Sequence, residues 1–175
     1  MNNQYIFYPN IPFDMEQIKD IVSRRLHETL PEYPTHHRKV ADEPYLVELQ
    51  KLYPFFIDIY SIYNTTPRRA VPIHTDSGRK CAVNIPIYYT EDSHTIFYKI
   101  KEDIEITRIP ERVYDVIKEE DVIEDVFRFT LDRPTLLNTR VPHNAIGGPL
   151  RNRIIMSWSV SLDYDYNTTK TLLGG

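Results

Sequence analysis

Two closely spaced ligating side chains are the first sign of chemistry in this sequence. His74 and Asp76 are separated by one residue and lie between a short apolar stretch and a Ser77-Gly78 turn. Side chains two apart on an extended chain point to the same side, so this pair can present an imidazole and a carboxylate together. A His-x-Asp pair alone is common by chance, and it needs a third member to indicate a metal site.

His143 supplies that third member, in a turn that precedes the last apolar strand. Two imidazoles and one carboxylate on one face are the ligand set of non-haem Fe(II) oxygenases, because three protein ligands leave positions open for a co-substrate and O2. Structural zinc sites normally use four protein ligands, and Cys81, the only cysteine, cannot form a thiolate cluster. The set therefore favours iron over zinc.

Arg153 extends this metal site toward a co-substrate. It lies ten residues beyond His143 and begins the apolar stretch 154–158, which is predicted to be a strand. A planar guanidinium on a rigid strand suits a bidentate grip on the distal carboxylate of a dicarboxylate. Arg151 would share the same face if the strand began earlier, and it is the alternative anchor. We prefer Arg153 because it lies nearer the core of the strand.

The strands that must position these residues follow Pro54. Apolar, β-branched and aromatic runs separated by turn residues predict an antiparallel sandwich or barrel without a long helix in its middle. The predicted strands are 55–63, 69–73, 80–89, 95–100, 122–131, 135–138 and 153–162. The charged segment 99–125 is interpreted either as a solvated insertion or as a lid over the site.

Two helices are predicted ahead of the sheet. Apolar residues recur at helical spacing over 13–30, with Asp14 as the N-cap, and a second short helix is predicted over 44–52. The last residues, 167–175, are predicted to be a loose tail. We expect one domain over 1–175, with a helical part at 13–53 and a β core at 55–162.

The composition excludes several classes of function. Of 175 residues, 41% are hydrophobic and 26% charged, as in an ordinary globular protein, and the net charge of -4 argues against a nucleic-acid or anionic-membrane partner. No apolar run approaches the roughly 18 residues of a membrane span, and the start lacks the features of a secretory signal. A single cysteine fits a reducing compartment. We therefore expect a cytoplasmic protein.

The ordered set of His74-x-Asp76, His143 and an arginine ten residues on, within a series of strands, resembles the 2-oxoglutarate and Fe(II)-dependent oxygenase superfamily, in particular its small prolyl-hydroxylase-like and phage-type members. The likeness spans roughly 55–162, and 74–79, 83–87, 95–98 and 137–143 look most like that subset. The resemblance implies a mainly β fold, a double-stranded β-helix (jelly roll, cupin-like), with the two N-terminal helices bracing the larger sheet. It also implies Fe(II), 2-oxoglutarate as co-substrate, and O2.

By the same resemblance, Tyr63 and Asn84 lie on strands beside the co-substrate, where a phenol or an amide could hydrogen-bond its carboxylates. A structural role is the alternative for each. Asn138 and Thr139 approach the second histidine and could orient its ring. Prolyl hydroxylases usually hold the distal carboxylate with lysine, whereas this chain offers Arg153, and it shows no peptide-binding motif of that family.

The expected reaction is hydroxylation of an unactivated C–H bond with release of succinate and CO2. The substrate is not specified by the sequence: it could be a peptide or protein side chain, or a small molecule such as a free amino acid or a nucleobase. Two other classes remain open, a cupin-like metalloenzyme of another reaction type, such as an isomerase, and a non-enzymatic β-sandwich binding module. Arg153 separates the oxygenase from the cupin-like metalloenzyme, and absence of metal uptake would indicate the binding module.

Overall fold

Two antiparallel sheets of six strands each make up most of the computed structural model, which describes residues 4–26, 36–40, 42–104, 106–108 and 114–175. Sheet I has the strand order β1-β10-β5-β12-β3-β2, and sheet II has the order β7-β8-β4-β11-β6-β9. The strands of sheet I are β1 (Ile6–Phe7), β2 (His36–Val40), β3 (Phe56–Thr65), β5 (Cys81–Tyr88), β10 (Thr135–Asn138) and β12 (Arg153–Val160). Those of sheet II are β4 (His74–Asp76), β6 (His94–Ile100), β7 (Thr107–Arg108), β8 (Tyr114–Val116), β9 (Val122–Phe129) and β11 (His143–Ile146).

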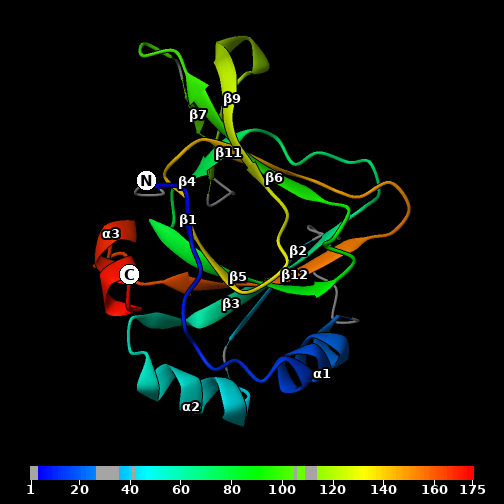
Figure 1. Cartoon of the computed structure of the whole chain (residues 1–175), viewed down its shortest axis with the longest axis vertical. Helices are drawn as coiled ribbons and strands as arrows, with labels where there is room; N and C mark the ends of the chain where they lie inside the picture. The colour runs from blue at the N-terminus through cyan, green and yellow to red at the C-terminus, as the bar shows by residue number, and fades with distance from the viewer. Residues whose placement is uncertain (1–3, 27–35, 41, 105, 109–113) are drawn as a thin grey trace.

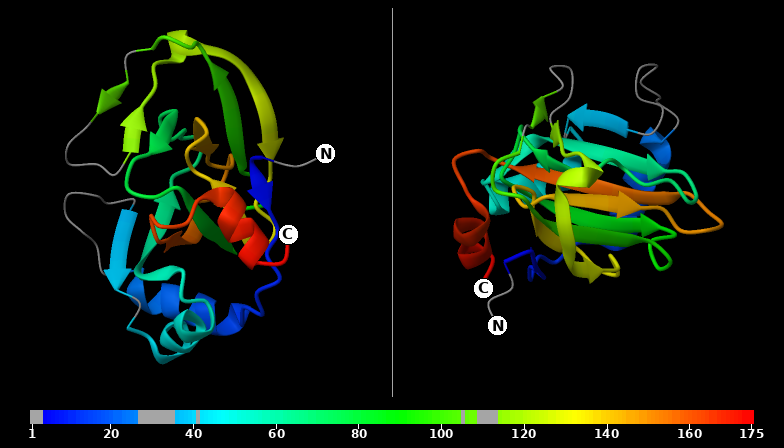
Figure 2. Two further views of the ribbon diagram at one scale, coloured as in Figure 1. Left: turned by 90° about the vertical axis from the view of Figure 1, so that its left-hand side faces the viewer. Right: turned by 90° about the horizontal axis from the view of Figure 1, so that it is seen from above.

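The two sheets face each other and the chain passes repeatedly from one to the other, as between β3 and β4 and between β5 and β6 (Figures 1 and 2). The helices are α1 (Met15–Arg25), α2 (Pro44–Leu52), α3 (Tyr166–Leu172) and the short 3-10 helix η1 (Glu119–Asp121). This mainly β sandwich is the jelly roll that the sequence predicts. None of the helices in the described part of the chain is long and apolar enough to span a membrane.

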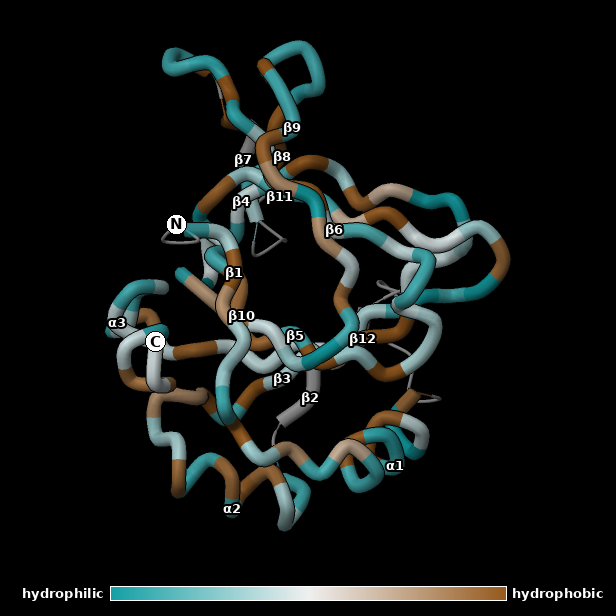
Figure 3. The backbone as a smooth tube through the Cα atoms, viewed as in Figure 1, coloured by the Kyte–Doolittle hydropathy of each residue, from teal (hydrophilic) through white to brown (hydrophobic). Residues whose placement is uncertain are grey.

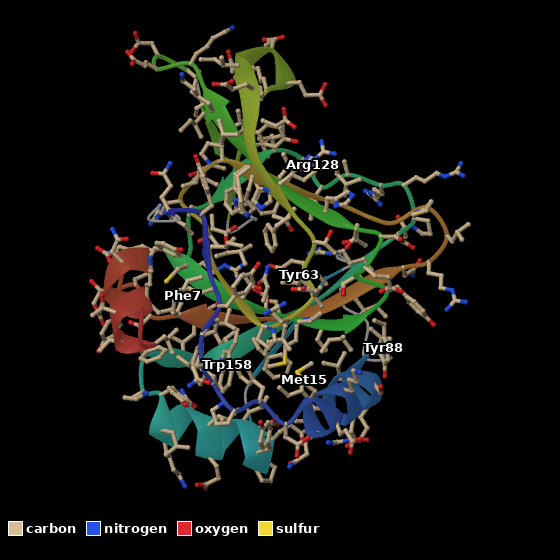
Figure 4. The ribbon with its side chains drawn as sticks, in the orientation of Figure 1. Phe7, Met15, Tyr63, Tyr88, Arg128 and Trp158 are labelled. Carbon is tan, nitrogen blue, oxygen red and sulfur yellow. The ribbon has the colours of Figure 1, made fainter. Side chains whose placement is uncertain are left out.

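The larger core lies outside the sandwich, between sheet I and the helices α1 and α2. Side chains alternate along β12, so Met156 and Trp158 point toward these helices, where Trp158 stacks on Phe56 with ring centroids 4.4 Å apart. Figure 4 shows Trp158 on this side of the sheet. Two N-terminal helices therefore brace sheet I from its outer face. The helices were expected on the larger sheet, but the two sheets have six strands each.

Helix α1 begins where the sequence predicts. The Asp14 carboxylate accepts hydrogen bonds from the backbone N–H groups of Glu16 and Gln17, which satisfies orphan donors of the first turn. The helix ends at Arg25, earlier than the predicted boundary at residue 30, and residues 27–35 lie outside the described part of the chain.

The interior between the two sheets is smaller and more polar. Its apolar part consists of Ile6, Phe97, Phe129, Leu131, Leu137 and Ile155. The inward side chains that follow Ile155 on β12 are Ser157 and Ser159, and both contact a buried arginine described below. An interior of this kind can hold a polar ligand between two apolar walls.

Several predicted boundaries are wrong. Residues 166–172 form helix α3, with Asp165 as its N-cap and Thr169 fully buried, so this stretch is not a loose tail. Its Thr-rich sequence has weak helix propensity, and tertiary packing decides its conformation. The predicted strand 69–73 is reduced to a single bridge between Ala70 and Ile146, and His143 begins strand β11 instead of lying in a turn.

At the two ends of the charged segment 99–125, the described residues of β6 and β9 extend beyond the sandwich as an arm of mostly hydrophilic residues (Figures 1 and 3). One part of the segment has a different position. Strand β8 pairs with β4, with Tyr114 opposite Asp76 and Val116 opposite His74. This part of the segment therefore belongs to the sheet that carries the candidate site.

Candidate metal centre

His74, Asp76 and His143 meet on the inner face of sheet II. His74 and His143 are register partners on the adjacent strands β4 and β11, and Asp76 lies two residues beyond His74 on the same face. One ligand atom from each of the three side chains lies within 4.8 Å of the others, with His74 Nε2 3.7 Å from Asp76 Oδ1. Each of the three is largely buried. The geometry fits a three-ligand divalent metal site of the His, Asp, His type.

Backbone carbonyls orient both imidazoles. His74 Nδ1 lies 2.7 Å from the carbonyl oxygen of Pro72, and His143 Nδ1 lies 2.9 Å from that of Val141. Because a carbonyl can only accept, each Nδ1 carries the proton and each Nε2 keeps its lone pair for a metal. Asn138 and Thr139 do not orient His143 through their side chains, which instead donate to the carbonyl oxygens of Gln4 and Arg79.

Arg79 is the residue of this site that the sequence reasoning missed. Its Nε donates to Asp76 Oδ2 at 2.6 Å, and its side chain is largely buried. Burial alone would raise the pKa of Asp76, but the charge of Arg79, its hydrogen bond and the two neighbouring imidazoles together outweigh this effect and hold that pKa below its ordinary value. The carboxylate is therefore ionised and ready to bind a cation. An arginine just past a Ser-Gly turn looks solvated in the sequence. Asp76 is only three residues away, but the partners of Arg79 on β12, Ser157 and Ser159, are brought to it by the fold.

Arg153 lies deep between the sheets. Only 2% of the residue is exposed, and its Nη2 reaches across the sandwich to Thr95 Oγ1 at 3.5 Å. Its Nε has no hydrogen-bond partner among the described residues, and burial lowers the pKa of the guanidinium to about 10. Arg151, the alternative anchor, is exposed and lies over the Tyr89 ring, with Cζ 4.7 Å from the ring centroid. A buried cation without an anion in the described structure fits an anionic ligand.

Tyr63 and Asn84 line the inner face of sheet I. Tyr63 lies opposite Ile155 and projects between the sheets (Figure 4), where its hydroxyl hydrogen-bonds with Ser61 and Arg79. Burial raises the pKa of its phenol, which therefore stays protonated. Asn84 lies opposite Ser157, and its buried Oδ1 has no partner within the described ranges. Both side chains belong to the interior that the metal ligands and Arg153 share.

His94 lies in the same sheet but outside this cluster. The side chain of His94 is half-buried, and its Nδ1 lies 3.2 Å from Thr130 Oγ1. His36 and His37 are on the edge strand β2, and their side chains lie outside the described part of the structure.

The metal-free protein is expected to lose stability as the pH falls from about 6.5 to about 4. Burial and the neighbouring His74 lower the pKa of His143 to about 4, whereas an unfolded chain binds this proton near pH 6.5. Above pH 6.5 the imidazole of His143 is neutral in both the folded and the unfolded state. Between pH 6.5 and pH 4 it binds a proton in the unfolded state and stays neutral in the folded state. Urea unfolding at a series of pH values, with a chelator, measures the effect. The fall should be shallower in His143→Asn, and parallel curves would contradict this assignment.

Solved structures of enzymes share this fold at low sequence identity. A prolyl-4-hydroxylase of Pseudomonas putida aligns with 89% of this chain and 90% of its own, at 13% identity and a TM-score of 0.50. SnoK, a non-haem alpha-ketoglutarate dependent carbocyclase from nogalamycin biosynthesis, aligns over 89% and 78%, at 12% identity and a TM-score of 0.51. The chain spans 29% of the length of hazelnut (Corylus avellana) vicilin, at 11% identity and a TM-score of 0.39. No family model and no curated protein matches the sequence.

At these identities the likeness shows a common fold, and activity has to be argued from the site. Fold and site together define the class: a jelly-roll protein with a candidate His, Asp, His metal centre on the inner face of one sheet. Opposite the centre, the other sheet presents a buried guanidinium.

Proposed function

We propose that this chain is an Fe(II)- and 2-oxoglutarate-dependent dioxygenase. In this proposal His74, Asp76 and His143 hold the metal, and Arg153 binds the distal carboxylate of 2-oxoglutarate. The reaction is hydroxylation of an unactivated C–H bond in a peptide, a protein side chain or a small molecule, with release of succinate and CO2. The observation that carries the proposal is Arg153, a buried guanidinium without an anionic partner in the described structure, in the same interior as the metal ligands.

The strand register supports a co-substrate of this length. His143 is the register partner of Phe97 on β6, and Thr95, which contacts Arg153, lies two residues further along the same face of that strand. Two residues of a strand span about 7 Å. A distance of this order between the metal and the guanidinium suits a short dicarboxylate that is chelated to the metal at one end and bound by Arg153 at the other.

The chain's own groups would bind, orient and protect the reactants. The guanidinium can form two parallel hydrogen bonds to a carboxylate, which fixes both its position and its plane. Phe97 and Ile155 form apolar walls beside the site and keep bulk water from it. Tyr63 and Asn84 offer a hydroxyl and an amide to the co-substrate from sheet I. When bound, Fe(II) would supply the activation of O2.

A cupin-like metalloenzyme of another reaction type is the main alternative. Such an enzyme could use the same three ligands, but it would have no evident need for an arginine buried without an anion. Burying a charge is costly unless a partner compensates it, so the arginine itself favours a carboxylate ligand. A non-enzymatic binding module would need neither the ligands nor the arginine.

The proposal is tested by anaerobic addition of Fe(II) and 2-oxoglutarate to the metal-free protein. A weak visible charge-transfer band is expected only when both are present, and His74→Ala should abolish it. Stimulated 2-oxoglutarate turnover across panels of peptides, amino acids and nucleobases then identifies the substrate. A folded wild-type protein that gives no band, although Fe(II) and 2-oxoglutarate are both in excess, would rule the proposal out.

A further inference from the structure

Arg79 connects the two sheets beneath the candidate metal centre. From the β4–β5 connection its Nε donates to Asp76 Oδ2 at 2.6 Å on sheet II. Its Nη1 donates to Ser157 Oγ at 2.9 Å and to Ser159 Oγ at 3.2 Å, both on β12 of sheet I. The Tyr63 hydroxyl also hydrogen-bonds with it. One planar group is therefore fixed by partners on β3, β4 and β12.

We propose that Arg79 is a positioning residue for the metal centre, an inference that rests on the proposed function. By holding Asp76 Oδ2 against sheet I, the guanidinium leaves Oδ1 as the oxygen that faces the metal. The arginine thus sets the ligand's orientation and its number of available oxygens, and it does so without touching the metal.

The positions of the two oxygens of Asp76 agree with these separate roles. Oδ1 is the oxygen that lies 3.7 Å from His74 Nε2, on the side where the ligand atoms converge, while Oδ2 is the oxygen bound by Arg79. A free carboxylate could turn both oxygens to a cation and occupy two coordination positions. With Oδ2 held, three protein atoms bind the metal and the remaining positions stay open for a bidentate co-substrate and O2.

The hydroxyl partners explain why arginine is used here. A guanidinium presents several donors in a rigid plane, so it can bond a carboxylate through Nε and two hydroxyls through Nη1 at the same time. Lysine could supply the charge, but its ammonium is a point charge on a flexible chain and would not fix the plane of Asp76. Ser157 and Ser159 lie on the same inner face of β12 as Ile155. The hydroxyl groups that hold Arg79 are therefore on the strand that also carries Arg153.

Co(II) binding to the metal-free full-length protein tests this role. Calorimetry measures its dissociation constant, and visible absorption reports the ligand geometry. Arg79→Met is expected to raise the dissociation constant by about 10- to 100-fold, the usual loss when a group that orients a metal ligand is removed, and to change the spectrum. Arg79→Lys should restore the charge but recover only part of the affinity. Ser157→Ala combined with Ser159→Ala keeps the ion pair, and a smaller loss is expected.

Arg128→Met is the matched control, because Arg128 is exposed and pairs only with Asp125 in the described structure. It should leave Co(II) binding unchanged. If Arg79 acted only as a charge, its removal would tighten Co(II) binding and lysine would restore the wild-type value fully; either result overturns the inference.

Arg79→Met could also fail to fold, which near-UV circular dichroism would detect. Arg79→Lys and the double serine variant then decide, and wild-type affinity and spectrum in both would overturn the inference. A wild-type protein that takes up no Co(II) would instead remove the proposed function, and the inference with it.

Discussion

Arg153→Met is expected to weaken 2-oxoglutarate binding by roughly 100-fold, because a buried charged partner of a carboxylate contributes several kcal/mol to affinity. Metal affinity should stay at the wild-type value, since Arg153 lies on sheet I and away from the three ligands. The expected loss is therefore specific to the co-substrate. Isothermal titration of the Co(II)-loaded protein with 2-oxoglutarate measures it.

The same variant is expected to unfold at a higher temperature than the wild type when no ligand is bound. Burial lowers the pKa of Arg153 to about 10, well below the value for an exposed arginine. For a base, this shift means that the folded state disfavours the proton, so the cost is fully present below pH 10 and disappears at higher pH, where the exposed side chain of the unfolded state also loses its proton. At neutral pH the cost is about 3 kcal/mol, and methionine, of similar length, removes it.

Arg151→Met is the matched control for both measurements, because Arg151 is exposed and packs on Tyr89. It should bind 2-oxoglutarate as the wild type does, with little change in unfolding temperature. Loss of co-substrate binding in Arg151→Met, with Arg153→Met unaffected, would reverse the assignment of the anchor.

His143→Ala is expected to weaken divalent metal binding by more than about 100-fold, because it removes one of three protein ligands, whereas loss of a residue behind a ligand already costs 10- to 100-fold. With only two protein ligands, the site competes poorly with water for the metal ion. Metal content after dialysis and Co(II) titration both report the loss. The charge-transfer band with Fe(II) and 2-oxoglutarate should disappear with it.

His94→Ala is the control for this variant, since His94 is half-buried in the same sheet and bonds with Thr130 outside the ligand cluster. It should keep wild-type metal affinity. Near-UV circular dichroism establishes that both variants fold. Equal metal content in His143→Ala and wild type would show that the metal binds elsewhere.

Much of the fold follows from local patterns. The apolar runs of β5 and β12 are readable in the sequence because both strands are largely buried, with one face packed on the helices, and the cap at Asp14 is a local hydrogen-bonding pattern. Strands β1, β4, β7 and β8 are two or three residues long, too short to have a readable period. Helix α3 was missed for a related reason: its Thr-rich sequence is weak, and packing of Tyr166 and Thr169 holds it in place.

The candidate metal ligands could be selected from the sequence because ligand chemistry needs particular residue types, and an extended chain places residues two apart on one side. Their proximity depends on the register of β4 against β11, which pairs His74 with His143 and cannot be read from the sequence. Arg153 was also selected by type and by its place on a strand. Only the fold shows that this strand faces inward at Arg153 and that Arg151 lies outside.

The burial of Arg79 and its contacts with sheet I were decided by tertiary structure. In the sequence it is a charged residue after a turn, and such a residue is usually solvated. Asp76 on β4 is a local partner three residues away, but the partners on β3 and β12 are far from Arg79 in the chain and meet it only when sheet I closes over sheet II. The sequence by itself therefore determined which side chains are candidates to bind a metal and a carboxylate. The packing of the two sheets decided how those atoms are oriented, because orientation depends on contacts between residues that no local pattern connects.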